Sequence, residues 1–232
     1  KPIGHFAVGG TFGLNFSKKV LAYGNSWEDL RKFVDNLAPS VFVSLNLEEL
    51  KQRKVDMLFH PGTHDYICWD VPEVGAKYPQ IPVYLRVNSA HSSKDKRNID
   101  PNENNKNAFL YNHFFGGEAL LAPPTINCEV KDKKLVVTVK FAEGSKEETG
   151  HIYWMYDRAP SGSGDYLRVK FPQEHLKEMK KSGDSWTVSI DLKDGQSSID
   201  VFTTHRKTIK CGSETYSTYL SSPYTRVDFL KK

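Results

Sequence analysis

The spacing of hydrophobic and polar positions changes along the chain, and the change falls near Pro123-Pro124. Before that point, short apolar runs alternate with segments whose apolar residues recur every three or four positions. After it, apolar residues recur at every second position, and turns rich in Gly, Asp and Ser separate the runs. The first spacing is typical of strands that alternate with helices, and the second of an all-β domain. The sequence therefore predicts two domains, residues 1–122 and residues 123–232.

The first part is predicted to be an α/β layer with a mostly parallel sheet. Strands are expected at residues 3–8, 40–45, 55–62 and 81–88. Helices are expected at residues 25–38, 46–54 and 106–117. Ser26 is a suitable N-cap for the first of these helices, and Gly116-Gly117 closes the last one. Strands that alternate with helices in this way are typical of α/β folds.

The second part is predicted to be a β-sandwich of the immunoglobulin or fibronectin type. Seven short strands are expected, at residues 126–132, 134–141, 150–157, 166–172, 185–192, 198–207 and 215–229. About seven short strands separated by Gly- and Asp-containing turns fit a sandwich of this size. A short helix is expected within residues 171–183, and Trp154 is expected to be the core tryptophan.

The composition limits the kinds of partner. Hydrophobic residues make up 38% of the chain and aromatic residues 12%, which is enough for real cores. The formal net charge is +4, with basic and acidic residues interspersed, so we expect no nucleic-acid partner. No apolar run approaches the roughly 20 residues of a membrane span, so none is expected. We also expect no cofactor.

The three cysteines are Cys68, Cys128 and Cys211. None has C-x-x-C spacing, so a zinc or redox motif is not expected. An odd count allows at most one internal disulfide, and Cys128 with Cys211 is the natural pair because both lie in the second half. Such a bridge would indicate a secretory compartment. The alternative, in which all three thiols are free, stays open.

Titratable residues follow two neighbouring predicted strands. Thr63, His64 and Asp65 come directly after the strand at 55–62, and His91 follows the next strand, 26 residues after Asp65. Functional groups gather at the carboxyl ends of parallel strands. A carboxylate that orients an imidazole, which then acts as general base, is the second half of a Ser-His-Asp arrangement. We therefore expect Asp65 to orient His91.

Two further arrangements of candidate residues lie at predicted strand ends. His64 and Asp65 could form a metal site with Asp70, but no third ligand has suitable spacing, so no metal is expected. Glycines lie two positions before and two positions after Thr11, as in a nucleophile elbow, and follow a strand. However, the β-branch of threonine stiffens its side chain and crowds such a tight turn. Thr11 is therefore a weak candidate nucleophile.

The segments "PGTHD" (61–65) and "RVNSAHS" (86–92) resemble the end of an α/β-hydrolase domain. With the following helix and β-sandwich, the chain is similar to the PhoPQ-activated pathogenicity-related family, including amoebal autocrine proliferation repressor-like proteins. The motifs cover roughly residues 40–125, and the rest is similar in layout. The resemblance implies a hydrolase fold in which Asp65 matches the family acid and His91 the family histidine.

The family nucleophile is a serine in a G-x-S-x-G-like elbow upstream of the acid, and this chain has no such serine. The resemblance therefore implies the C-terminal part of a serine-hydrolase-like protein of the esterase or peptidase type. Its nucleophile would lie on a missing N-terminal segment or on a companion chain of the same precursor. An ester or amide would be the substrate, and the isolated chain should show little esterase activity.

Two alternatives stay open. The first is a noncatalytic secreted binding or signalling protein that retains the hydrolase fold and binds a cell-surface receptor. The second is a carbohydrate-binding accessory protein that uses sandwich aromatics such as Tyr153, Tyr156 and Tyr166. A secreted or periplasmic location is expected in either case.

Overall fold

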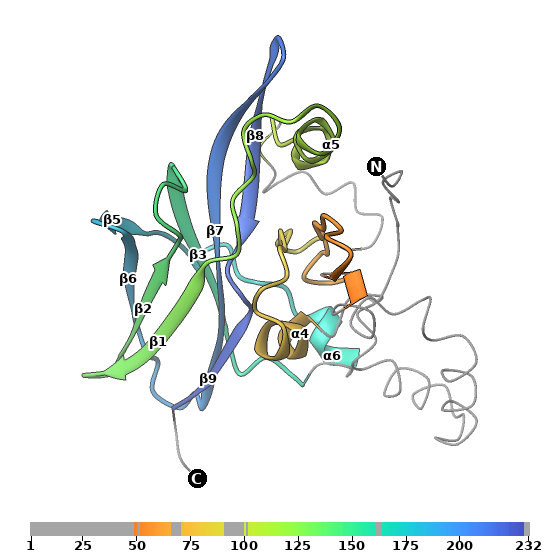
Figure 1. Ribbon diagram of the computed structural model, residues 1–232. Helices are drawn as coiled ribbons and strands as arrows, with labels where there is room; N and C mark the ends of the chain where they lie inside the picture. Colours follow the sequence, from red (N-terminus) through yellow and green to blue (C-terminus); the bar gives the residue numbers. More distant parts are fainter. Residues whose placement is uncertain are drawn as a thin grey trace, which may run out of the picture.

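The computed structural model describes residues 49–50, 52–65, 71–90, 100, 102–160 and 164–229. Two antiparallel sheets face each other as a sandwich (Figure 1). The first sheet contains, in spatial order, β1 (Thr125–Lys131), β2 (Lys134–Lys140), β6 (Ser185–Asp191) and β5 (Lys180–Ser182). The second contains, in spatial order, β4 (Leu176–Glu178), β3 (Thr149–Tyr156), β7 (Ser198–Cys211) and β8 (Glu214–Ser221), with β9 (Thr225–Asp228) also paired to β7.

Alternation of apolar and polar residues builds the core between the sheets. On β2 and β6 every second side chain is buried, because successive side chains of a strand point to opposite faces. Trp154 lies in this core, as predicted. The fully enclosed aliphatic side chains that meet here are Leu135, Val137, Val139, Ile152, Ile199 and Val201. Burying each of them contributes about 1.5–3 kcal/mol.

The 14-residue strand β7 is the central strand of the second sheet. It pairs with β3 along one side, and with β8 and then β9 along the other. Its first eight residues are all buried, which means that both faces are covered. Val201 faces the core between the sheets, whereas Phe202 faces a second apolar cluster on the outer side.

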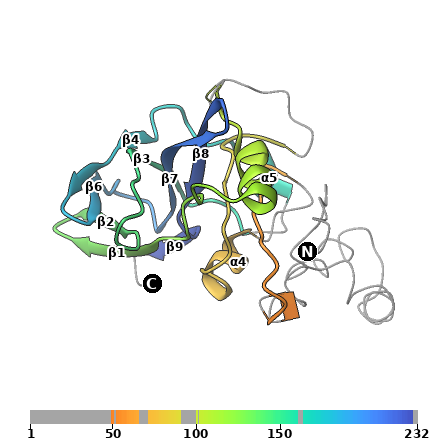
Figure 2. The same cartoon turned by 45° about the horizontal axis from the view of Figure 1, so that its top comes forward.

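The outer face of the second sheet is covered by chain that precedes the sandwich and by the segment after β3 (Figures 1 and 2). The helices of this layer are α4 (Val71–Lys77), α5 (Asn105–Phe115) and α6 (Gly164–Arg168). The apolar cluster beneath it contains Val71, Ile81, Leu85, Met155, Phe171, Phe202 and Tyr224. The Asn105 amide fastens α5 to the sheet, since it donates to the Tyr219 carbonyl at 2.7 Å and accepts from the Tyr219 N–H at 2.6 Å.

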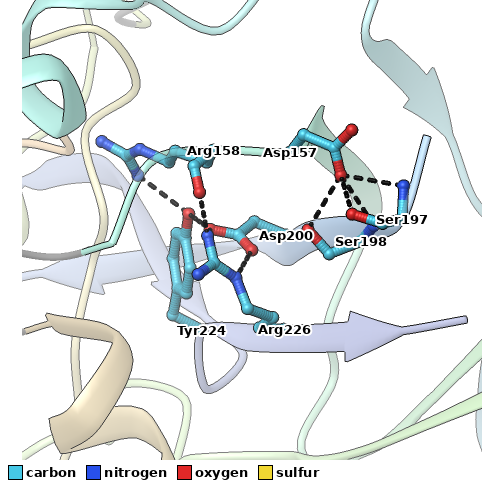
Figure 3. A network of polar contacts seen from close by, with 7 residues as sticks. All are labelled: Asp157, Arg158, Ser197, Ser198, Asp200, Tyr224 and Arg226. Carbon is cyan, nitrogen blue, oxygen red and sulfur yellow. Dashed lines mark hydrogen bonds and ion pairs between the residues drawn. The ribbon is translucent and has the colours of Figure 1, made fainter. Parts of the chain in front are cut away.

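A buried polar network ties the end of β3 to β9 (Figure 3). Asp200 accepts a hydrogen bond from the Tyr224 hydroxyl at 2.7 Å and forms an ion pair with Arg226. The Arg158 guanidinium donates to the Tyr224 hydroxyl at 2.8 Å and lies 3.6 Å from the centre of the Tyr166 ring. Arg158 is only 4% exposed, so these contacts replace the water that a buried cation loses.

The Asp157 side chain also holds the end of β3, through hydrogen bonds to Ser197 and Ser198 at the start of β7 (Figure 3). Its Oδ1 accepts hydrogen bonds from the N–H and the hydroxyl of both Ser197 and Ser198, at 2.8–3.2 Å. These bonds hold the pKa of Asp157 below its ordinary value against the effect of desolvation. The chain from Tyr156 to Arg158 is therefore held firmly at the start of β7.

The predicted α/β layer is wrong, whereas the predicted β-sandwich is confirmed. Segments 55–62 and 81–88 do run parallel, and backbone hydrogen bonds join them, including those from the Phe59 N–H to the Pro82 carbonyl at 3.0 Å and from the Tyr84 N–H to the Phe59 carbonyl at 2.8 Å. No wider parallel sheet is present among the described residues, and these two segments pack on the outer face of β7 and its neighbours. The expected elements at 3–8, 25–38 and 40–45 lie outside the described residues.

Two local assignments inside the sandwich are also wrong. Of the strand expected at 166–172, residues 166–168 instead belong to helix α6, and residues 169–172 form no regular element; the buried Tyr166 and Phe171 pack against Arg158. The helix expected within 171–183 is instead two short strands, β4 and β5. The helix expected at 106–117 is confirmed as α5.

The domain boundary between residues 122 and 123 stays a prediction. In the part of the chain that the structure describes, no helix is long and apolar enough to cross a membrane.

Buried histidines should make the fold sensitive to acid. Burial lowers the pKa of His60 and His64 to about 4 and that of His205 to about 3, from an ordinary value of 6.5. The unfolded chain therefore takes up protons first as the pH falls below 6.5. We expect the free energy of unfolding to drop between pH 6.5 and 4, by about 1.4 kcal/mol per pH unit for each such histidine.

Urea unfolding at a series of pH values measures this slope. In His205→Gln the free energy of unfolding should change less steeply with pH, by about 1.4 kcal/mol per pH unit, which is the contribution of one histidine. This difference in slope does not depend on the variant's absolute stability. Equal slopes in the two proteins would contradict a neutral, buried His205.

Candidate functional site

An open pocket lies where β3, β4 and β6 end or begin, between the two sheets. Its volume is about 290 Å³. The residues that line it, called the aromatic pocket below, are Trp154, Tyr156, Glu174, His175, Lys177, Ile190, Asp191 and Lys193. This volume is at the lower end of the range of small-molecule sites, about 300–1,000 Å³.

Strand geometry supplies the floor of the aromatic pocket. Trp154 and Tyr156 are two residues apart on β3, so both side chains point to the inner face of their sheet. Ile190 points inward from β6 in the facing sheet. The Tyr156 hydroxyl donates to the Asp191 carbonyl at 2.6 Å, which joins the two sheets at this end. Tyr156 is half-buried, so part of its ring stays accessible.

His175 adds a third ring. Its imidazole stacks on the Trp154 indole, with centroids 5.0 Å apart and planes at 16°, and meets the edge of Tyr156 at 5.6 Å. Its Nδ1 lies 3.2 Å from the Trp154 carbonyl, which can only accept, so Nδ1 carries the proton. The neutral ring therefore presents Nε2 as a hydrogen-bond acceptor.

Lys193 covers the mouth of the aromatic pocket. Its ammonium lies 3.4 Å from His175 Nε2 and 5.4 Å from the centre of the Tyr156 ring. Burial lowers the pKa of His175 below its ordinary value, and the positive charge of this ammonium lowers it further. Burial likewise raises the pKa of Tyr156, so its hydroxyl stays protonated. Both rings are thus uncharged at neutral pH.

The rim of the aromatic pocket is polar. The Lys177 ammonium donates to the Ser189 carbonyl at 2.9 Å. Glu174 is exposed beside His175, and the Asp191 carboxylate lies 3.3 Å from Lys134. Aromatic walls with a few polar groups at the mouth are typical of sites that bind small molecules without covalent chemistry. Among the described residues, no group of three His, Cys, Asp or Glu side chains could hold a metal ion.

Asp65, the predicted acid, lies in a buried turn and does not line the aromatic pocket. It is 4% exposed, and its N–H donates to the Gly62 carbonyl at 3.1 Å. The turn packs so closely against Ser89 that a Cβ atom on Gly62 would lie 1.9 Å from the Ser89 carbonyl oxygen. His91 and Thr11 lie outside the described residues, so the Asp65–His91 pair stays a prediction.

His64, the candidate metal ligand, has both ring nitrogens occupied. Nε2 donates to the Val169 carbonyl at 2.8 Å, and Nδ1 accepts from the Thr63 hydroxyl at 2.9 Å. The Thr63 hydroxyl in turn accepts from the Asn88 N–H at 2.8 Å. His64 therefore has a structural role, since it joins the turn to the segment directly after α6. Asp70, its proposed partner, lies outside the described residues.

The three tyrosines considered as carbohydrate-binding residues lie in different environments. Tyr153 points to the outer face and stacks on Phe202 at 5.3 Å. Tyr166 is buried beneath Arg158. Only Tyr156 lines the aromatic pocket, and the sequence did not indicate its companions His175 and Lys193. For Tyr156 itself the sequence did carry a signal. Tyr156 lies two residues after Trp154 on one strand, so its side chain points to the same inner face.

Cys128 and Cys211 are not bonded to each other, since both are free thiols. Cys128 packs at the edge of the core between the sheets, whereas Cys211 packs with Ala108 near α5. Burial raises the pKa of Cys128 to about 11, which keeps it protonated and unreactive. Cys68 lies outside the described residues.

Neither a protein-family model nor a curated protein matches this chain. Among solved structures, it is similar to a carbohydrate-binding module family 56 β-1,3-glucan binding domain, with 13% identity and a TM-score of 0.26, over 43% of this chain and 98% of that one. A laminaripentaose-producing β-1,3-glucanase of glycoside hydrolase family 64 from Paenibacillus barengoltzii, in complex with laminarihexaose, has 13% identity and a TM-score of 0.26, over 47% and 21%. A DUF3823 family protein from Bacteroides ovatus has 10% identity and a TM-score of 0.27, over 45% and 53%.

These similarities are too weak to support a shared function. The two antiparallel sheets nevertheless correct the expectation of a PhoPQ-activated pathogenicity-related hydrolase, because no α/β-hydrolase layer is present in the described residues. The interpretation as a C-terminal hydrolase fragment is wrong for the same reason, and the alternative of a binding protein that retains the hydrolase fold is not supported.

The contact between Lys193 and His175 can be tested by titration. In Lys193→Gln the positive charge is lost, so the pKa of His175 should rise toward 6.5. In Lys193→Arg the charge is kept, so the pKa should stay low. Imidazole resonances followed by NMR against pH measure both, and an unchanged pKa in Lys193→Gln would contradict the contact.

Proposed function

We propose that this chain is a sugar-binding protein whose β-sandwich holds a saccharide in the aromatic pocket. The observation that carries this proposal is the group of three rings, Trp154, His175 and Tyr156, in an open pocket with ammonium and carboxylate groups at its rim. No catalytic role for the pocket is part of the proposal.

The chemistry of a sugar ring matches this arrangement. A pyranose has an apolar face of C–H groups and an edge of hydroxyls. An aromatic face packs against the C–H groups, and hydrogen-bond donors and acceptors around it satisfy the hydroxyls. The half-buried Tyr156 ring supplies the face, while Lys177, Lys193 and Glu174 supply the polar groups.

The strand order supports a finer description of the fold. The order β1-β2-β6-β5 matches the A-B-E-D sheet of immunoglobulin-type sandwiches, and β3-β7-β8 matches the C-F-G sheet, with β4 as an additional edge strand. We include this topology in the proposal. In such sandwiches, loops gather at the two ends, and the aromatic pocket lies at the end where β3 and β6 finish. Secretion also remains a proposal, because the free thiols of Cys128 and Cys211 remove the disulfide argument for it.

Removal of the Tyr156 ring should abolish most of the affinity. Tyr156→Ala should weaken binding about tenfold, since a lost aromatic contact of roughly 1.4 kcal/mol corresponds to that change. Tyr156→Phe keeps the ring and loses only the hydrogen bond to Asp191, so it should bind nearly as well as the unchanged protein. Isothermal titration calorimetry with neutral and acidic oligosaccharides, including β-1,3-, β-1,4- and α-1,4-linked glucans, measures these affinities.

A control variant tests whether the effect is local. Tyr216→Ala removes a half-buried tyrosine on β8, which does not line the aromatic pocket, and should leave affinity unchanged. Absence of binding to every sugar, or equal affinity of Tyr156→Ala and the unchanged protein, would contradict the proposed function.

A further inference from the structure

Among the described residues, four lysines of the sandwich are paired with a carboxylate, whereas the two lysines of the aromatic pocket are not. Lys133, Lys134, Lys181 and Lys207 each form an ion pair with a carboxylate at 3.0–3.3 Å. Lys177 and Lys193, by contrast, form no ion pair with any carboxylate that the structure describes. Each instead contacts an uncharged acceptor, the Ser189 carbonyl and His175 Nε2 respectively.

Lys193 is the less satisfied of the two. An ammonium has three donors, and its contact with His175 Nε2, at 3.4 Å, is longer than a typical hydrogen bond. Its other neighbour is the face of Tyr156, a weak partner for an exposed cation. A ligand that occupies the Tyr156 face must also displace or meet this ammonium.

The charges around the pocket do not cancel. Glu174 is the acidic group at the rim that lacks a described ion pair, because the Asp191 carboxylate lies against Lys134. Two ammonium groups against the single Glu174 carboxylate leave one positive charge at the mouth. A neutral ligand would accept hydrogen bonds from the ammonium groups but would leave their charge to water, whereas an anionic group would form ion pairs in which both partners of each hydrogen bond are charged.

We infer that the aromatic pocket selects sugars that carry a negative group, a carboxylate or a sulfate, and that this group pairs with Lys193 and Lys177. The inference rests on the proposed function, since it names the class of sugar that the same pocket takes. The ring face of the sugar packs on Tyr156, and its anionic substituent replaces His175 as the partner of Lys193. His175 then keeps its bond to the Trp154 carbonyl and remains part of the wall.

The test compares trigalacturonic acid with its fully methyl-esterified form, which has the same rings without the charge. Calorimetry at 150 mM NaCl should give at least tenfold tighter binding of the acid. That preference should fall to less than threefold in Lys193→Met and in Lys177→Met. In Lys210→Met, which removes an exposed charge on β7 away from the pocket, it should persist. A sulfated trisaccharide bound in the same lysine-dependent way would identify sulfate as the preferred anion.

Failure of this inference and failure of the proposed function give different results. If the acid and the ester bind equally well, and Tyr156→Ala still abolishes binding, the charge selection is overturned and the sugar site stands. A preference for the acid that Lys210→Met reduces as much as Lys193→Met overturns the inference too, because the attraction is then that of the whole basic surface. If neither the trisaccharides nor the glucans bind, both the inference and the proposed function are overturned.

Discussion

The pairing of β7 with strands on both of its sides is the constraint on which the rest of this structure depends. β3 occupies one side over eight residue pairs, from Thr149↔Arg206 to Tyr156↔Ile199. β8 and β9 share the other side. Because one face of β7 meets the first sheet and the other meets the outer layer, both apolar clusters assemble on it. A shift of one residue in this register would turn Trp154 and Tyr156 out of the sandwich.

The aromatic pocket follows from how β3 ends. Tyr156 is the last residue of the strand, and the two residues after it are held at the same place by different groups. Asp157 is bound by four donors at the start of β7, and Arg158 is enclosed between rings above Tyr224. The two terminal nitrogens of Arg158 donate to the Tyr224 hydroxyl and to the Thr63 and Tyr166 carbonyls, which ties this strand end to three other segments. The Tyr156 ring is thereby placed before any ligand arrives, which lowers the entropy lost on binding.

Alternation in the sequence predicted the strands of the sandwich well, because a strand with one buried face repeats its apolar positions every second residue. Before residue 123 the helix expected at 106–117 is confirmed, but the predicted parallel sheet is not. Segments 55–62 and 81–88 do lie parallel, as expected, but they cover the outer face of β7 and do not form a sheet of their own. Local pattern cannot distinguish a strand of a parallel sheet from an apolar segment that packs on another sheet. The error then spread to function, because the resemblance to a hydrolase depended on that layer.

The candidate site was only partly visible in the sequence for a related reason. Tyr156 could be placed on a strand, whereas His175 precedes a three-residue strand and Lys193 lies in the connection to β7. Their meeting depends on the pairing of β3 with β4 and on the approach of the two sheets, which no spacing along the chain encodes. Conversely, His64 and Asp65 stood out as titratable neighbours, yet His64 uses both nitrogens to hold the turn together.

The location of the binding site is the central claim, and NMR mapping of backbone amides tests it most directly. An acidic oligosaccharide titrated into the ¹⁵N-labelled protein should shift the amides of residues 154–157, 174–177 and 190–193, with small changes elsewhere. Shifts concentrated at residues 61–65 and 86–90, around the buried Asp65 turn, would contradict the account and direct attention back to that turn.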